Sequence, residues 1–89
     1  MRAIVTVLGH DRVGITAAVC AMLASFDVNI LDISQTVLQG YFTMIMLVDA
    51  SASQKPFADM VSELSEMGKA SGLDIRMQRE DIFNAMHRI

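Results

Sequence analysis

The sequence has 89 residues, of which 53% are hydrophobic and 19% are charged, so its composition is that of one small globular domain rather than a disordered chain. The formal charge is −3 and the seven Lys and Arg residues are scattered, which argues against nucleic acid as a partner, because phosphate binding needs a basic stripe. No apolar run approaches the roughly 20 residues of a membrane span, so we expect a soluble cytoplasmic domain without a membrane partner.

The single cysteine, Cys20, cannot form a disulfide within the chain, which fits a reducing compartment. The apolar stretch of the N-terminus, MRAIVTVLGHD, is too short and too soon charged for a signal peptide. Both features favour a cytoplasmic location.

The first two elements are predicted to be a strand and a helix. Residues 3–8, AIVTVL, form a β-branched run that we expect Gly9 to end. From Ile15 the apolar residues recur at helical spacing, and the face that we expect to be buried consists of Ile15, Val19, Met22, Leu23 and Phe26.

A hairpin follows, in which residues 28–38 and 41–50 form two strands joined at Gly40. Both faces of the second strand are apolar: one carries Phe42, Met44, Met46 and Val48, the other Thr43, Ile45 and Leu47. One face must lie under the helices, and we expect a C-terminal helix and a second subunit to cover the other.

The last third of the chain predicts a helix, a strand and a short closing helix. Pro56 suits a first helical turn, the helix runs to residue 71, and Gly72 provides a left-handed cap. Residues 73–79 alternate apolar and polar side chains as in a half-buried strand. Asp81 is expected to cap a helix over about residues 80–89, with an apolar stripe of Ile82, Phe83, Met86 and Ile89.

This order of elements predicts an α+β fold, the ferredoxin-like βαββαβ sandwich, as a single domain over residues 1–89. Its four-stranded antiparallel sheet has helices on one face and an additional short helix at the C-terminus. Right-handed crossovers place the first and third strands at the centre and the second and fourth at the edges.

Several kinds of chemistry lack the residues that they need. Paired cysteines after the first strand, a basic frame around strand aromatics and a glycine-dense phosphate loop are all missing. The neighbouring His10 and Asp11 invite a catalytic interpretation, but no nucleophile stands at a recognisable spacing. The only other histidine is His87, so we expect no metal, no cofactor and no catalytic residues. Catalysis by the His10–Asp11 pair remains a weaker hypothesis.

The junction LGHDRVGITAAV, residues 8–19, carries the clearest candidate site. The first N–H groups of a helix beginning after Gly14 lack internal partners and favour an anion such as a carboxylate. Gly14 allows a close approach and is able to adopt a positive φ. The alternative is a solvated helix start, capped by Asp11 and salt-bridged by Arg12.

Four stretches in order resemble the ACT domain, a small regulatory module that binds amino acids: GHDRVG at 9–14, FDVNI at 26–30, DISQT at 32–36 and YFTM at 41–44. The segment 31–49 and the IFNAM tail at 82–86 are closer still to stand-alone single-ACT-domain proteins. Two positions depart from the family pattern: Val13 stands where many ACT loops have Pro, and Asp11 stands where serine-sensing versions have Asn.

The resemblance implies a homodimer, or a higher oligomer, with a small amino-acid-like ligand at the subunit boundary. Backbone amides around Gly14 meet the ligand carboxylate, Asp11 its ammonium, and Asn29 faces the same site across the interface. Arg12 is a rim residue. The residues expected to bind the ligand are His10, Asp11, Arg12, Val13, Gly14, Ile15, Asn29 and Ile30.

The sequence thus predicts a non-enzymatic domain that senses a small molecule and acts through a separate regulated protein. The alternative is an adaptor without a ligand, whose apolar faces and edge strand recruit another protein.

Overall fold

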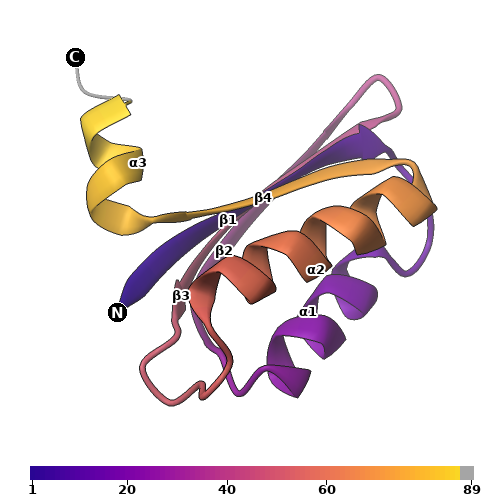
Figure 1. Ribbon diagram of the computed structural model, residues 1–89. Coiled ribbons are helices and arrows are strands. Elements are labelled where there is room, and N and C mark those ends of the chain that lie inside the picture. Colours follow the sequence, from indigo (N-terminus) through magenta and orange to yellow (C-terminus); the bar gives the residue numbers. More distant parts are fainter. Residues whose placement is uncertain (87–89) are drawn as a thin grey trace.

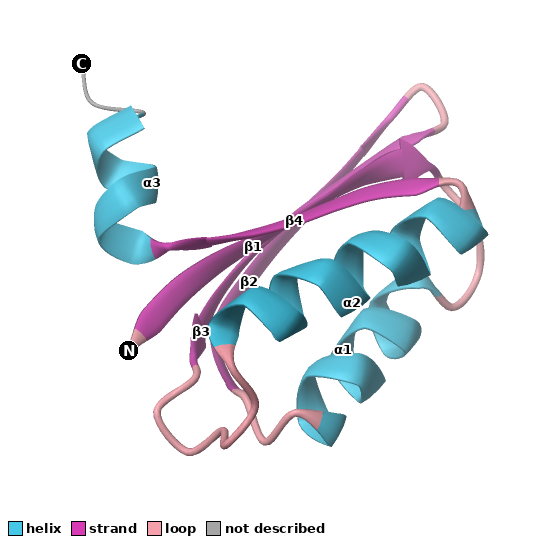
Figure 2. Ribbon diagram, in the orientation of Figure 1, coloured by secondary structure: helices cyan, strands magenta, loops and turns pink. Residues whose placement is uncertain are grey.

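The computed structural model describes residues 1–86 and forms a sheet with two helices on one face (Figures 1 and 2). Its elements are β1 (Arg2–His10), α1 (Ile15–Ser25), β2 (Asn29–Leu38), β3 (Tyr41–Asp49), α2 (Phe57–Ser71), β4 (Leu73–Arg79) and α3 (Glu80–Met86). All strand pairs are antiparallel and the order is β2-β3-β1-β4. The predicted ferredoxin-like fold, with the first and third strands at the centre, is therefore confirmed.

The core lies between the sheet and the helices α1 and α2. The predicted face of α1 is buried along its length, with Met22 only partly so. In β3 the alternation is as predicted, because every second side chain from Phe42 to Val48 is buried. The residues of this core with no exposed surface are Ala3, Val5, Val7, Val19, Leu23, Met44, Met46, Val48 and Leu64.

Gly9 does not end β1, contrary to the prediction. It pairs with both Phe42 of β3 and Leu73 of β4, and the strand continues to His10. A Cβ on Gly9 would lie 2.5 Å from Leu73 Cδ2, at the tip of a side chain that is able to shift, and 3.3 Å from the Gly72 carbonyl oxygen, so glycine gives the start of β4 room to approach closely.

The hairpin between β2 and β3 turns through two residues with positive φ, Gln39 at 50° and Gly40 at 83°. This combination gives the twist that a two-residue hairpin requires. Strand β2 also contains a β-bulge between Ile30 and Asp32, which the sequence pattern did not indicate. As an edge strand, β2 is exposed at every residue except the half-buried Ile30.

Helix α3 begins at Glu80, so Asp81 lies inside its first turn rather than at the predicted cap. The Asp81 carboxylate accepts a hydrogen bond from the Ile82 N–H and pairs with Arg79. The predicted extension of the helix to residue 89 lies outside the described residues, and so do His87 and Ile89.

The outer face of the sheet, defined as the face away from α1 and α2, is only slightly covered by α3. This helix packs against β1 and β4 at one end of the sheet (Figure 1). Leu8 and Ile45 on this face remain 51% and 45% exposed. Covering by a second subunit stays a prediction.

Gly68 marks the closest approach of α2 to β4. A Cβ at this buried glycine would lie 2.8 Å from the carbonyl oxygen of Leu73 and 3.0 Å from Ile75 Cγ1. Because the first of these atoms belongs to the backbone, the strand or the helix would have to move.

Replacing Gly68 by Ala is therefore expected to lower the free energy of unfolding by about 1–3 kcal/mol, although alanine has the higher helix propensity. Urea unfolding measures the change. The control Glu66→Ala, at an exposed position of the same helix, should stay within about 0.5 kcal/mol of the parent protein. A more stable Gly68→Ala variant would contradict the close packing of α2 on β4.

Candidate functional site

The loop between β1 and α1 is fixed against the turn of the β2–β3 hairpin. The Asp11 N–H donates a 2.8 Å hydrogen bond to the carbonyl oxygen of Gly40. One residue earlier, the His10 ring stacks on Tyr41 with 5.0 Å between the ring centroids. His10 pairs with Tyr41 in the sheet, and both side chains lie on the outer face. The imidazole therefore lies on the side of the sheet opposite to α1.

Gly14 directly precedes α1, and the space around the position of its missing side chain is open. Its φ is 90°, as the sequence allowed, and no side chain caps the helix. The first hydrogen bond of α1 runs from the Ala18 N–H to the Gly14 carbonyl oxygen, so the N–H groups of residues 15–17 lack helical partners. Among residues 1–86, and apart from Gly14 and its two chain neighbours, no atom lies within 4 Å of where a Gly14 Cβ would stand. The N–H groups at the start of α1 thus lie next to open space at Gly14.

The alternative in which Asp11 caps the helix and Arg12 forms a salt bridge is wrong. Over residues 1–86, neither side chain forms a hydrogen bond or an ion pair, and both are exposed. Val13 is fully exposed beside them. Ile15, in contrast, is only 4% exposed and packs in the core, so its side chain anchors the helix start.

Asn29 and Ile30 lie at the opposite end of the molecule from this loop. Asn29 pairs with Asp49, whereas His10 pairs with Tyr41 at the other end of β3. Eight residues of strand separate the two ends, which corresponds to about 26 Å. One chain therefore does not bring Asn29 and Gly14 into one site.

Thr16 and Gln35 were not among the predicted site residues. The Thr16 hydroxyl donates a hydrogen bond to Gln35 Oε1 at 3.1 Å and lies 3.9 Å from the sulfur of Met44. Gln35 is on β2 opposite the buried Met44, so its side chain extends on the helix side of the sheet. This contact joins the first turn of α1 to the edge strand, next to Gly14.

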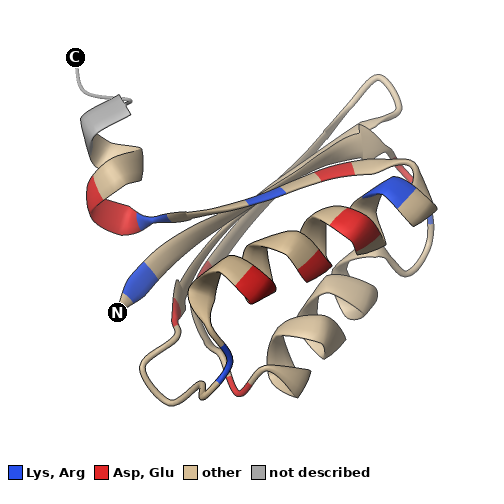
Figure 3. Ribbon diagram, in the orientation of Figure 1, with Lys and Arg blue, Asp and Glu red and all other residues tan. Residues whose placement is uncertain are grey.

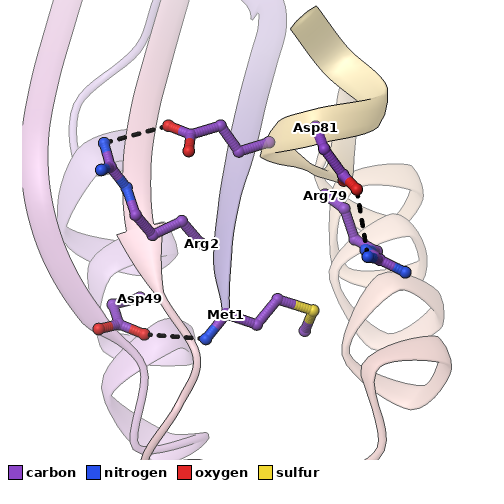
Figure 4. Close-up of a pocket in the computed structure, with 6 residues that line it drawn as sticks. Met1, Arg2, Asp49, Arg79 and Asp81 are labelled. Carbon is purple, nitrogen blue, oxygen red and sulfur yellow. Dashed lines mark hydrogen bonds and ion pairs between the residues drawn. The ribbon is translucent and has the colours of Figure 1, made fainter. Parts of the chain in front are cut away.

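A hollow of about 420 Å³ lies at the end of the sheet far from this loop (Figure 4). Its charged groups are already paired with each other, through Met1 with Asp49, Arg2 with Glu80 and Arg79 with Asp81. These ion pairs hold the strand ends and the start of α3 together, so they leave no free charge to bind a ligand. A smaller hollow of about 130 Å³ on the outer face is lined by Ile4, Asp32, Ile33, Ser34, Ile45 and Leu47.

Charge is distributed unequally between the two helices (Figure 3). The sequence of α1 contains no charged residue, whereas α2 carries Asp59, Glu63, Glu66 and Lys69. In the part of the chain that the structure describes, no group of three His, Cys, Asp or Glu side chains could hold a metal ion. No helix over residues 1–86 is long and apolar enough to cross a membrane.

The βαββαβ fold with its antiparallel β2-β3-β1-β4 sheet is that of a small regulatory module, the ACT domain. A family model for the ACT domain matches residues 2–78, and the chain belongs to this family of regulatory ligand-binding domains. A UPF0237 protein of Clostridium acetobutylicum is 54% identical over 89 residues, which cover all of both chains. Its name assigns it no enzymatic activity.

Solved structures agree with this assignment. An ACT domain protein from Streptococcus pneumoniae is 41% identical, with a TM-score of 0.82 and 98% of each chain covered. A formyltetrahydrofolate deformylase from Pseudomonas putida shares the fold at 14% identity, with a TM-score of 0.80 over 91% of this chain and 29% of the enzyme chain.

Asp49, opposite Asn29, has a lowered pKa because its carboxylate accepts hydrogen bonds from Ser51. The side-chain hydroxyl contributes most and the backbone N–H, at 2.9 Å from Asp49 Oδ1, contributes next. A carboxyl group whose pKa is lowered on folding stabilises the protein above its unfolded pKa, and that stabilisation is lost as the pH falls through the folded pKa.

The variant Ser51→Ala should raise the pKa of Asp49 toward its usual value of 3.8, because the hydroxyl donor is removed while the backbone donor stays. Titration of the carboxyl carbon by NMR measures the shift. In Ser62→Ala, a serine-to-alanine change on α2, the pKa of Asp49 should not move. An unchanged pKa in Ser51→Ala would show that the hydroxyl does not control this carboxylate.

Proposed function

We propose that the protein is a cytoplasmic homodimeric regulatory domain that binds an amino acid or a similar metabolite at its subunit interface and acts on a separate protein. The observation that carries this proposal is that the predicted binding residues lie in two groups at opposite ends of β2, which is an edge strand of the sheet in the described part of the chain. A second copy is needed to unite the two groups.

Antiparallel pairing of the β2 edge strands of two subunits would bring the two groups of predicted binding residues together. A two-fold axis at Ser34 places Ile33 opposite Gln35 of the partner subunit, and both positions face the helix side. The bulge between Ile30 and Asp32 then shifts the register by one residue, so that Asn29 comes opposite Leu38 of the partner subunit. Leu38 directly precedes the hairpin turn to which the loop after β1 is bound. Each site thus combines the loop of one subunit with Asn29 of the other.

The surface of α1 supports pairing on this side of the molecule. Its exposed positions include the small, uncharged Ala17, Ala21 and Ala24, whereas a helix that faces only water normally carries charges. Pairing at β2 would bring α1 next to the same helix of the partner subunit, across a seam that also covers the exposed apolar Val37. The acidic α2 remains at the outside.

The residues of this composite site suit the two charged groups of an amino acid. The N–H groups behind Gly14 are free to receive the carboxylate, and the unpaired carboxylate of Asp11 is free to receive the ammonium. Asn29 pairs with Asp49, so its side chain starts from the outer face of the sheet. In the proposed site the amide of Asn29 of the partner subunit must reach around the first residue of β2, where it serves either charged group. Arg12 and Val13 form the rim, and His10, which stacks on Tyr41, borders the site through its backbone.

The second candidate function is an adaptor that binds another protein without a ligand. The observation in its favour is the exposed apolar surface around Leu8 and Ile45 on the outer face of the sheet. Thermal unfolding in the presence of each of the 20 common amino acids at millimolar concentration separates the two candidates. A raised Tm with one or more of them supports the ligand-binding domain, and no change with any of them supports the adaptor.

Mixing two variants that each bind the ligand weakly tests whether the site is shared between subunits. Asp11→Ala and Asn29→Ala should each weaken binding of the stabilising amino acid by roughly 10-fold, since each removes one polar partner. In a mixed dimer, one site contains both changes and the other contains neither. Equal mixing with subunit exchange should therefore restore about one quarter of the sites to full affinity.

Isothermal titration calorimetry of the mixture counts these restored sites. The control Asp59→Ala on α2 should bind as the parent protein does. If mixing restores no site although the subunits exchange, the loop and Asn29 do not act across one interface.

A further inference from the structure

The Gln35 side chain forms a hydrogen bond at the junction of α1 and β2. Its Oε1 accepts the hydrogen bond from the Thr16 hydroxyl at 3.1 Å, so its amide nitrogen, with two N–H donors, is directed away from Thr16. Thr16 itself is half-buried and lies against the sulfur of Met44, which has no exposed surface. Thr16 thus joins the core to the Gln35 amide and orients the oxygen of that amide toward α1.

This amide is on the same side of the sheet as the start of α1. Thr16 is the second residue of α1, two residues after Gly14, and Gln35 is exposed on the helix side of β2. In the proposed site the carboxylate and the ammonium of the ligand are held by the helix start and by Asp11. The side chain of the amino-acid ligand is then the group that would contact the Gln35 amide.

We infer that Gln35 selects amino acids whose side chain carries a hydrogen-bond acceptor. The inference rests on the proposed function and adds the class of ligand. Because the Thr16 hydroxyl donates to Oε1, the N–H groups of the Gln35 amide remain available as donors. An aliphatic ligand would displace water from these N–H groups without accepting a hydrogen bond from them. Sites that form a hydrogen bond to a ligand side chain discriminate strongly against analogues that lack it.

L-Asparagine and L-leucine provide a matched pair of probes, because their side chains branch alike and differ in polarity. The variant Gln35→Met is nearly isosteric, but its thioether has no N–H to donate and no oxygen to accept a hydrogen bond from the amide of L-asparagine. The control Gln54→Met makes the same chemical change at an exposed position in the loop before α2.

We expect the parent protein to bind L-asparagine more tightly than L-leucine in isothermal titration calorimetry. Gln35→Met should weaken binding of L-asparagine by about tenfold and should not weaken that of L-leucine. Gln54→Met should bind both as the parent does.

Three results would overturn the inference. Equal or tighter binding of L-leucine by the parent protein would show that the side-chain position is apolar. A preference for L-asparagine that Gln35→Met retains would assign selectivity to another residue and leave the proposed function intact. Binding of no amino acid at all would remove this inference together with the amino-acid form of the proposed function.

Discussion

The antiparallel pairing of β1 with β3 over nine residues is the constraint on which both the core and the candidate site depend. It sets the alternation that directs Val5, Val7, Met44 and Met46 into the core. It also brings the end of β1 to the hairpin turn, where the Gly40 carbonyl oxygen receives the Asp11 N–H. The loop that presents Gly14 is thus positioned by the backbone of the sheet and not by its own side chains.

The same pairing makes a single chain insufficient for the proposed function. Because β3 runs along the whole length of β2, the two groups of binding residues are held at opposite ends of the sheet. A loop movement is too small to bring together residues about 26 Å apart. In the proposed dimer, a two-fold axis at Ser34 brings the loop of one subunit near Asn29 of the partner subunit without changing either subunit. A free edge strand is usually a liability, and in this proposal it is the element that completes the site.

Local patterns in the sequence were sufficient to predict most of the fold. Helical spacing identified the buried face of α1, and the alternation in β3 identified which side chains enter the core, because both depend only on the period of the element. The sequence also indicated that Gly14 is able to adopt a positive φ, since a glycine between a loop and a helical pattern suits that conformation.

The features that could not be predicted depend on residues far apart in the sequence. Gly9 continues β1 because Leu73 approaches it, and the bulge after Ile30 exists only relative to β3. The hydrogen bond between Thr16 and Gln35 joins residues 19 positions apart through the packing of α1 on the sheet. The position of Asn29 relative to Gly14 likewise follows from strand register, which no short motif encodes.

The central claim is that two β2 strands pair in antiparallel register, and isotope-filtered NOE spectroscopy on a mixture of labelled and unlabelled protein tests it most directly. The account predicts intermolecular NOEs between Ile33 of one subunit and Gln35 of the partner, and between Ser34 and its own copy. Intermolecular NOEs confined to residues of the outer face, or none at all, would contradict it.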